Sequence, residues 1–185
     1  MNKTLLSALI VAGAAMGAQF AHASDGTVNF VGKVNDQTCT PTAASKDLTV
    51  TLPTVSKSSL VNPGDTTGVT PFTINLTGCN AAAGNVRAYF EPGPTVNMAD
   101  GNLTNTKVAG GATNVEIALL NPTASLTGTT RNILVNADAT AQVSAYQPIQ
   151  ADGTAALPYA AQYYATGVST PGDVTSSVTY SISYN

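Results

Sequence analysis

Charged side chains, tryptophan and histidine are scarce in this chain of 185 residues. Only 9% of the residues are charged, tryptophan is absent, and the one histidine is His22. The sequence also lacks the G-x-S-x-G elbow, the S-x-x-K motif and the G-x-x-x-x-G-K-[ST] phosphate loop. No calcium loop of the D-x-[DN]-x-[DN]-G type occurs either. These absences predict a protein that is not an enzyme and that binds neither a metal nor a cofactor.

The ten acidic residues stand singly, most of them beside turn residues, as at Asp65, Glu91, Asp152 and Asp173. This distribution favours solvated loop charges over paired catalytic carboxylates. The seven basic residues, set against the ten acidic ones, give a net charge of −3, and they form no cluster. Nucleic-acid binding depends on neutralising phosphates, so we expect no nucleic-acid partner. The low charge predicts a surface of neutral polar groups.

A leader is indicated at the N-terminus. Lys3 precedes an apolar run over residues 5–18, and the small-residue triplet Ala21-His22-Ala23 follows. This is the pattern of a secretory signal peptide covering residues 1–23. The run is shorter than the roughly 20 residues that span a bilayer, so we expect an exported chain without membrane insertion. The remaining residues suffice for one domain.

Two cysteines remain after the predicted cleavage, Cys39 and Cys79. An even count in an exported domain normally means a disulfide. A reactive thiol pair is the alternative, but the chain has no C-x-x-C spacing.

The C-terminal segment, residues 174–185, alternates with a period of two. Its odd-numbered side chains are hydroxyl-bearing up to Ser183, and the other face carries Val174, Ser176, Val178, Tyr180, Ile182 and Tyr184. This pattern predicts a strand with one buried face. A final strand at the edge of a sheet offers unpaired backbone groups to strands of other chains.

A second alternating segment lies near the N-terminus, with Gly26, Val28, Phe30, Gly32 and Val34 on one face. Two interpretations are open. The segment is either the first strand of an ordinary β-sandwich or a strand donated to a neighbouring molecule.

Short strands separated by turn clusters are predicted between these two ends. Their expected positions are residues 47–52, 72–79, 85–91, 115–121, 131–136, 141–149 and 157–165. No long helical period occurs outside the leader. Many short strands with one disulfide indicate an all-β, immunoglobulin-like sandwich.

The sequence resembles the type 1-like fimbrial subunits, the structural pilins that Gram-negative bacteria assemble by the chaperone–usher route. The resemblance rests on the leader, the arm G-T-V-N-F-V-G-K-V at residues 26–34, the cysteine spacing, and an ending with Gly172 fourteenth from the C-terminus and Tyr184 next to last. Residues 45–155 match only in being β-rich. Gln162 departs from the arginine that many relatives carry there, and no role is attached to it.

The resemblance implies an incomplete sandwich whose missing strand is donated by another chain. Residues 24–37 would form the donor arm and residues 38–185 the pilin domain. The expected partners are further copies of the chain, a periplasmic chaperone and an outer-membrane usher, and the expected location is a fimbria on the cell surface. Recognition of the groove would involve Gly172, Val178, Tyr180, Ile182 and Tyr184.

Three alternative functions remain at this point. The chain could be a minor or adaptor pilin, a secreted glycan-binding adhesin module, or an exported β-sandwich that does not polymerise. A tip adhesin is expected to carry an additional receptor-binding domain, for which 162 residues after the leader leave no room. The donor-like arm favours a polymerising pilin over the last alternative.

Overall fold

The computed structural model describes residues 28–29, 39–122 and 131–185. The chain divides into two compact units, residues 1–35 and residues 36–185, and the fold described below is that of the second unit. The predicted leader and most of the donor arm, including Gly26, Phe30, Gly32 and Val34, lie outside the described residues.

Strands dominate the second unit. The helices are single turns, α1 (Ala43–Lys46), η1 (Lys57–Ser59) and η2 (Ala81–Ala83). The strands are β1 (Thr40–Pro41), β2 (Thr66–Thr77), β3 (Asn85–Phe90), β4 (Leu103–Thr104), β5 (Val115–Leu120), β6 (Asn132–Ile133), β7 (Gln147–Pro148), β8 (Ala155–Ala165) and β9 (Tyr180–Tyr184).

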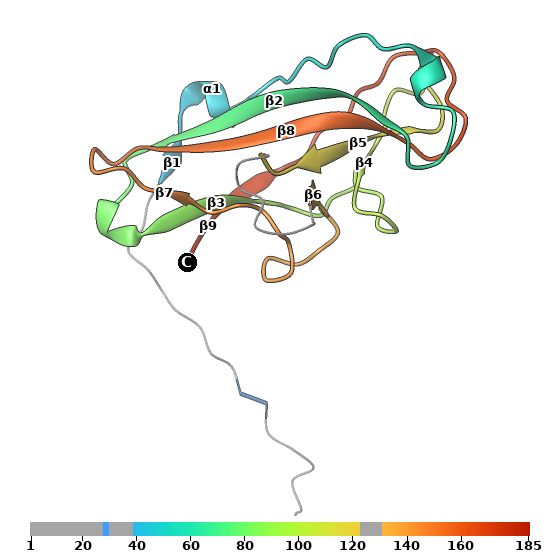
Figure 1. Ribbon diagram of the computed structural model, residues 1–185. Coiled ribbons are helices and arrows are strands. Elements are labelled where there is room, and N and C mark those ends of the chain that lie inside the picture. The colour runs from blue at the N-terminus through green and yellow to red at the C-terminus, as the bar shows by residue number, and fades with distance from the viewer. Residues whose placement is uncertain (1–27, 30–38, 123–130) are drawn as a thin grey trace, which may run out of the picture. The chain divides into compact units, whose positions relative to one another are not determined.

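The described strands form two sheets. One has the order β1-β2-β8-β5-β4, with β6 also paired to β5, and the other has the order β7-β3-β9. Every strand pair is antiparallel, and the longest ladder joins β2 to β8. Figure 1 shows β2 and β8 side by side in one layer and β3 with β9 in the layer below. This confirms the predicted β-sandwich.

The core lies between the two sheets. Side chains at alternate positions of β2, β3 and β8 point into it, because neighbouring residues of a strand face opposite sides. Deeply buried residues of these strands include Ile74, Leu76, Val86, Ala88, Phe90, Leu157 and Tyr159. The ring of Tyr159 packs edge-on against Phe90 at 5.1 Å between centroids. Aromatic pairs of this geometry contribute beyond the area that they bury.

Tyr159 also forms a hydrogen bond across the core. Its hydroxyl accepts this bond, 2.9 Å long, from the backbone N–H of Ala88. Burial raises the pKa of this tyrosine to about 12. Because the folded-state pKa lies above the ordinary value, the associated stability is present below pH 10 and is lost as the pH rises through 12.

Tyr159→Phe is expected to lower the free energy of unfolding at pH 7 by about 1–3 kcal/mol, since the Ala88 N–H loses its acceptor. The variant should also lose less stability than the parent between pH 9 and 12. Urea unfolding at pH 7 measures the first effect, and urea unfolding at pH 9 and at pH 12 measures the second. Tyr146→Phe, at a tyrosine that is 39% exposed, is the control. Equal stabilities of parent and Tyr159→Phe at pH 7 would contradict this role.

Several strand predictions are confirmed and others are wrong. The segments predicted at 72–79, 85–91, 115–121 and 157–165 correspond to β2, β3, β5 and β8. Segment 131–136 contains only the short β6, and of segment 174–185 only residues 180–184 form a strand. Residues 47–52, predicted as a strand, belong to no sheet. Figure 1 shows this stretch running from α1 along the length of β2 to η1.

The segment predicted at 141–149 contains only the short β7, which pairs with β3, because side chains rather than a backbone ladder hold residues 141–146 against β3. Arg87 donates to the carbonyl oxygens of Gln142 at 2.7 Å and Ser144 at 3.3 Å. The amide of Gln142 bonds both the N–H and the C=O of Phe90. The outer edge of β3 beyond β7 is therefore closed by side chains.

The prediction that the acidic residues are solvated loop charges is wrong for Glu116. It lies within β5, is 7% exposed, and accepts a hydrogen bond of 2.9 Å from the side-chain amide of Asn97. Burial raises its pKa, and the nearby Asp100 adds to the effect. The sequence signal for the burial of Glu116 was its position inside the apolar run over residues 115–120.

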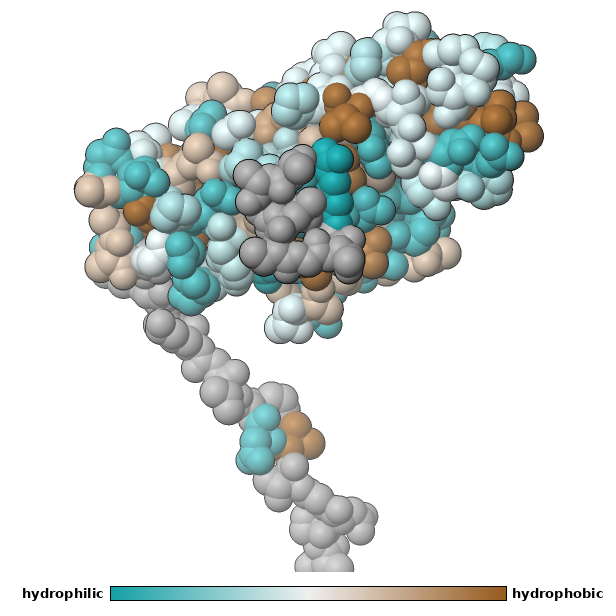
Figure 2. All heavy atoms as spheres, viewed as in Figure 1, coloured by the Kyte–Doolittle hydropathy of each residue, from teal (hydrophilic) through white to brown (hydrophobic). Residues whose placement is uncertain are grey.

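The surface agrees with the low charge of the sequence. On the face shown in Figure 2, most coloured residues are pale or teal, and the brown apolar residues form small groups. Within residues 28–29, 39–122 and 131–185, no helix has the length and apolar character needed to cross a membrane.

Candidate functional site: an open groove beside the C-terminal strand

The C-terminal strand lies at the edge of the smaller sheet. β9 pairs with β3 in the register Phe90↔Tyr180 to Val86↔Tyr184 and is the last strand in the order β7-β3-β9. Among the described residues, no strand pairs with its other side. An edge of this kind carries a row of unpaired N–H and C=O groups.

Within the part of the chain that the structure describes, the segment before β9 makes its backbone bonds on one side only. The carbonyl oxygens of Thr175, Ser177 and Thr179 accept hydrogen bonds from Thr106 N at 2.8 Å, Thr95 Oγ1 at 2.6 Å and Glu91 N at 2.9 Å. In an extended chain, alternate residues direct their backbone groups to opposite sides. The backbone groups of Ser176 and Val178 therefore point to the open side.

The inner face of this segment is only half-buried. Val174, Ser176, Val178, Tyr180, Ile182 and Tyr184 all have intermediate exposure, although the apolar ones among them pack against the core. The neighbouring strand β3 differs, since Val86 and Ala88 are 0% exposed. Part of the apolar face of β9 is thus left without a cover.

Two hollows lie beside this face. The first, of about 420 Å³, is lined by Ser176, Val178 and Tyr180 on one side, by residues 45–50 and Leu52 on the other, and by core side chains at its floor. The second, of about 540 Å³, is lined by residues 169–175 together with Leu60, Val115 and Tyr163. Together they follow the open side of residues 169–180. We call this pair of hollows the groove.

One wall of the groove explains the failed prediction at residues 47–52. The alternation of Leu48, Val50 and Leu52 with polar residues is typical of a strand. A strand also needs a partner for its backbone groups, and this segment borders the groove instead of a sheet. Residues 47–52 therefore have the alternation of a strand, but no strand lies beside them to pair with among the described residues.

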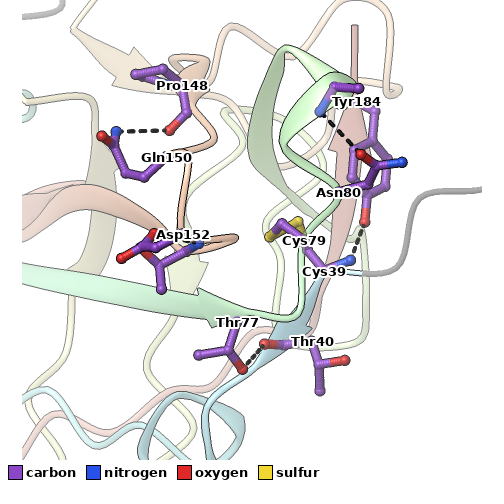
Figure 3. The surroundings of a disulfide bond; sticks show 11 residues. Cys39, Thr40, Thr77, Cys79, Asn80, Pro148, Gln150, Asp152 and Tyr184 are labelled. Atoms are coloured by element: carbon purple, nitrogen blue, oxygen red, sulfur yellow. Dashed lines mark hydrogen bonds between the residues drawn. A yellow bond between two sulfur atoms is a disulfide. The ribbon is translucent and has the colours of Figure 1, made fainter.

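Two tyrosines join the strand to the N-terminal part of the domain at one end of the groove. The hydroxyl of Tyr180 donates to the carbonyl oxygen of Ser45 at 2.8 Å. The hydroxyl of Tyr184 accepts from the backbone N–H of Cys39 at 3.0 Å, as Figure 3 shows. These contacts fix the position of residues 39–45 against β9.

The predicted disulfide between Cys39 and Cys79 is present, with a sulfur–sulfur distance of 2.03 Å. It joins the chain just before β1 to the chain just after β2, and β1 pairs with the end of β2. The bond therefore anchors the domain at the point where the segment preceding residue 39 enters it.

Gly172 stands where the C-terminal segment enters the groove. A side chain there would collide with backbone, since an added Cβ would lie 2.3 Å from Ala112 N and 2.5 Å from Gly111 C. Asp173 forms a parallel bridge with Gly111 at the same point. Only glycine allows this close approach of two backbones.

The structure brings together five of the predicted residues, Gly172, Val178, Tyr180, Ile182 and Tyr184, on or before β9. Val28, one of the two arm residues that the structure describes, is 76% exposed and belongs to no helix or strand. Sequence reasoning placed Ser176 on the inner face but did not count it among the groove residues, and it missed the groove walls at Leu52 and Leu60.

This arrangement defines a class of protein, a β-sandwich with an open edge and a groove along it. The chain matches the family described as Type-1 fimbrial protein, A, over residues 52–185. The "Major fimbrial subunit SMF-1" of Stenotrophomonas maltophilia is 49% identical over 89% of this chain and 95% of its own length. The "F17 fimbrial protein" of Escherichia coli is 48% identical over 95% of this chain and 94% of its own.

A solved structure supports the fold. The P pilus rod subunit PapA aligns with a TM-score of 0.57 at 20% identity, covering 80% of this chain and 99% of its own. The chain therefore belongs to the type-1 fimbrial protein family, as the sequence resemblance predicted. It is a structural subunit of cell-surface fimbriae and not an enzyme, and its fold is the incomplete sandwich of pilin rod subunits.

Proposed function

We propose that this chain is a major fimbrial subunit that polymerises by donor-strand exchange, in which the N-terminal arm of one copy fills the groove of the next. The observation that carries the proposal is the open side of residues 174–184, where half-buried apolar side chains lie beside a strand edge that has no second neighbour among the described residues. A strand is the ligand that satisfies both the exposed apolar face and the row of backbone groups.

The arm has the features that such a ligand needs. Val28, Phe30 and Val34 recur with the period of a strand, so they would enter the groove while the intervening residues face outward. The disulfide at Cys39 anchors the chain five residues after Val34. The arm of each copy would thus extend from a fixed point on its own domain toward a neighbour.

The free energies involved explain why the recipient must be incomplete. Burying Val28, Phe30 and Val34 contributes about 1.5–3 kcal/mol each, and about eight main-chain hydrogen bonds contribute ~0.5–1.5 kcal/mol each. Ordering about ten arm residues costs roughly 10–20 kcal/mol. These contributions nearly cancel. The net driving force would come from the groove, whose apolar lining is otherwise left partly in water.

We also propose that a periplasmic chaperone occupies the groove before polymerisation and that an outer-membrane usher guides assembly, with residues 1–23 serving as the export signal. This part of the proposal is supported by the resemblance of the leader, the arm and the C-terminal strand to chaperone–usher pilins. The open edge of β9 is a suitable docking strand for any extended segment.

Tyr184→Ala is expected to reduce capture by the chaperone, because it removes both a half-buried ring of the inner face and the acceptor for Cys39 N–H. Periplasmic subunit levels in cells that co-express the chaperone should fall severalfold. Tyr184→Phe is the matched control, since it keeps the ring and loses only the hydrogen bond, and it should stay near the parent level. Undiminished levels of Tyr184→Ala would show that the ring is not needed for capture.

Electron microscopy of cells that express the chain with its chaperone and usher tests the proposed function. Long rods labelled along their length by an antibody to this chain are expected. Labelling confined to the tips would instead show a minor or adaptor subunit. Secreted protein without any fibre would refute the proposal.

A further inference from the structure

The edge of the smaller sheet that lies opposite β9 differs from the groove, because it is closed. β3 pairs with β7 only at Asn85 and Val86. Glu91, just past the end of β3, bonds toward the C-terminal segment, so the backbone groups of Ala88 and Phe90 point to the opposite edge, where no described strand lies beside them. Side chains occupy that position instead.

These side chains supply the bonds that a neighbouring strand would make. The amide of Gln142 accepts from the N–H of Phe90 at 2.9 Å and donates to its carbonyl oxygen at 2.9 Å. At Ala88, the hydroxyl of Ser144 donates to the carbonyl oxygen at 2.6 Å, and the hydroxyl of Tyr159 accepts from the N–H at 2.9 Å. Gln142 and Ser144 are both buried. We call their two side chains the cap.

The segment that carries the cap does not present a new open edge. An ordinary edge strand would carry its own outward row of unpaired backbone groups. Here the carbonyl oxygens of Gln142 and Ser144 turn inward to the guanidinium of Arg87, at 2.7 and 3.3 Å. The same guanidinium bonds the carbonyl oxygen of Ala139 at 2.5 Å and lies 4.6 Å from the ring centre of Tyr146. Arg87 therefore fastens this segment to β3.

Asn121 seals the next part of the segment. Its side-chain amide donates to the carbonyl oxygen of Val143 and accepts from the N–H of Ala145 at 2.8 Å. Asn121 is buried, as Gln142 is. Two buried amide side chains thus replace peptide groups, Gln142 toward β3 and Asn121 toward residues 143–145. The sheet ends here in a network of buried side-chain hydrogen bonds and not in an exposed row of backbone groups.

We propose that the cap denies the β3 edge to strands of other chains, so that a strand can join the smaller sheet only at β9. This inference rests on the proposed function, in which extended segments of many copies are brought together. A subunit with two open edges would pair with a second copy at the wrong one and be lost from assembly. Gln142 and Ser144 are then specificity-determining residues. Arg87 is a positioning residue, because it acts through the segment that carries them.

Removal of the cap would leave the N–H and the carbonyl of Phe90 and the carbonyl of Ala88 without partners. Buried groups without partners are costly, so residues 139–146 should detach and expose the edge. Two copies would then pair their β3 edges about a two-fold axis, with Ala88 of each opposite Phe90 of the other. Tyr89 would face Tyr89 in a non-hydrogen-bonded pair, in which Cα atoms lie about 4.5 Å apart, within reach of a disulfide.

Cysteine trapping at position 89, in the complex of the full chain with its chaperone, tests the proposal. The chaperone would occupy the groove there, so cross-links report on the β3 edge alone. Tyr89→Cys is combined with Gln142→Ala/Ser144→Ala, and the matched control combines it with Val143→Ala, a change of an exposed side chain in the same segment. Disulfides are mapped by mass spectrometry after oxidation. We expect at least about tenfold more 89-to-89 links without the cap than in the control.

Equal yields of this link from the two variants would overturn the proposal. Links from position 89 to Cys39 or Cys79 in place of the 89-to-89 link would show general unfolding and would overturn it as well. Ser144→Ala alone, which keeps Gln142, serves if the double substitution prevents accumulation. Its yield should exceed that of the Val143→Ala control about threefold, and no excess would again refute the cap. A parent chain that forms no complex with the chaperone would instead contradict the proposed function.

Discussion

Deletion of residues 24–34 is expected to leave a subunit that binds its chaperone and forms no fibre by itself. The deletion removes every apolar residue of the arm but none of the residues that line the groove. The truncated subunit should therefore still accept an arm while donating none. Fibre length by electron microscopy and chaperone complexes by affinity purification measure the two activities.

Co-expression with the parent chain provides an internal check. Each truncated copy would be incorporated once and would then present no arm, so the fibres should become shorter as its share rises. Asn29→Ala, on the outward face of the arm, is the matched control and should assemble normally. Fibres of parental length from the truncated subunit alone would rule out donation by this segment.

Replacement of both cysteines by serine is expected to have the largest effect on the domain itself. A disulfide that closes a loop of this length contributes about 4 kcal/mol to the free energy of unfolding in the chain-entropy model. Typical domains have only about 5–15 kcal/mol in total, and this sandwich leaves one edge open. The doubly substituted subunit should therefore fail to accumulate in the periplasm.

Immunoblots of periplasmic extracts measure that accumulation, with Ser58→Ala, a substitution of an exposed side chain, as the control. Thermal unfolding of any recovered protein gives the stability directly. Parental levels of the cysteine-free subunit would show that pairing of β1 with β2 holds the start of the domain without the covalent bond.

The sequence predicted those parts of the fold in which local pattern and tertiary pairing agree. In β3 and β8, alternating side chains and flanking turns coincide with neighbours on both sides, so their positions were predicted to within a few residues. The disulfide followed from the cysteine count. The inner face of the C-terminal segment followed from its alternation.

The wrong predictions concern residues whose structure depends on distant contacts more than on their own sequence pattern. Residues 47–52 alternate like a strand but border the groove, and residues 141–146 are held by Arg87 and Gln142 instead of by a ladder. The burial of Glu116 depends on Asn97, which approaches from a separate loop. None of these partners can be identified from the local sequence.

The groove itself was predicted through the resemblance and not through composition. Its walls come from segments more than 100 residues apart, at Leu52 and at Val178, and its two hollows depend on side chains of the core. The alternation of the C-terminal segment indicated which face would be inward. It did not indicate that this face would stay half-exposed.

Thermal unfolding of the truncated subunit, lacking residues 24–34, with and without a synthetic peptide of residues 24–36 tests the open sheet most directly. At a peptide concentration of about 100 times the Kd, binding adds ~2.7 kcal/mol, which raises the Tm by about 5–10 °C for a domain of this size. Hydrogen exchange at Ser176 and Val178 should slow at the same time, and a peptide with Val28 and Phe30 replaced by serine should have little effect. An unchanged Tm and unchanged exchange at saturating peptide would contradict the account.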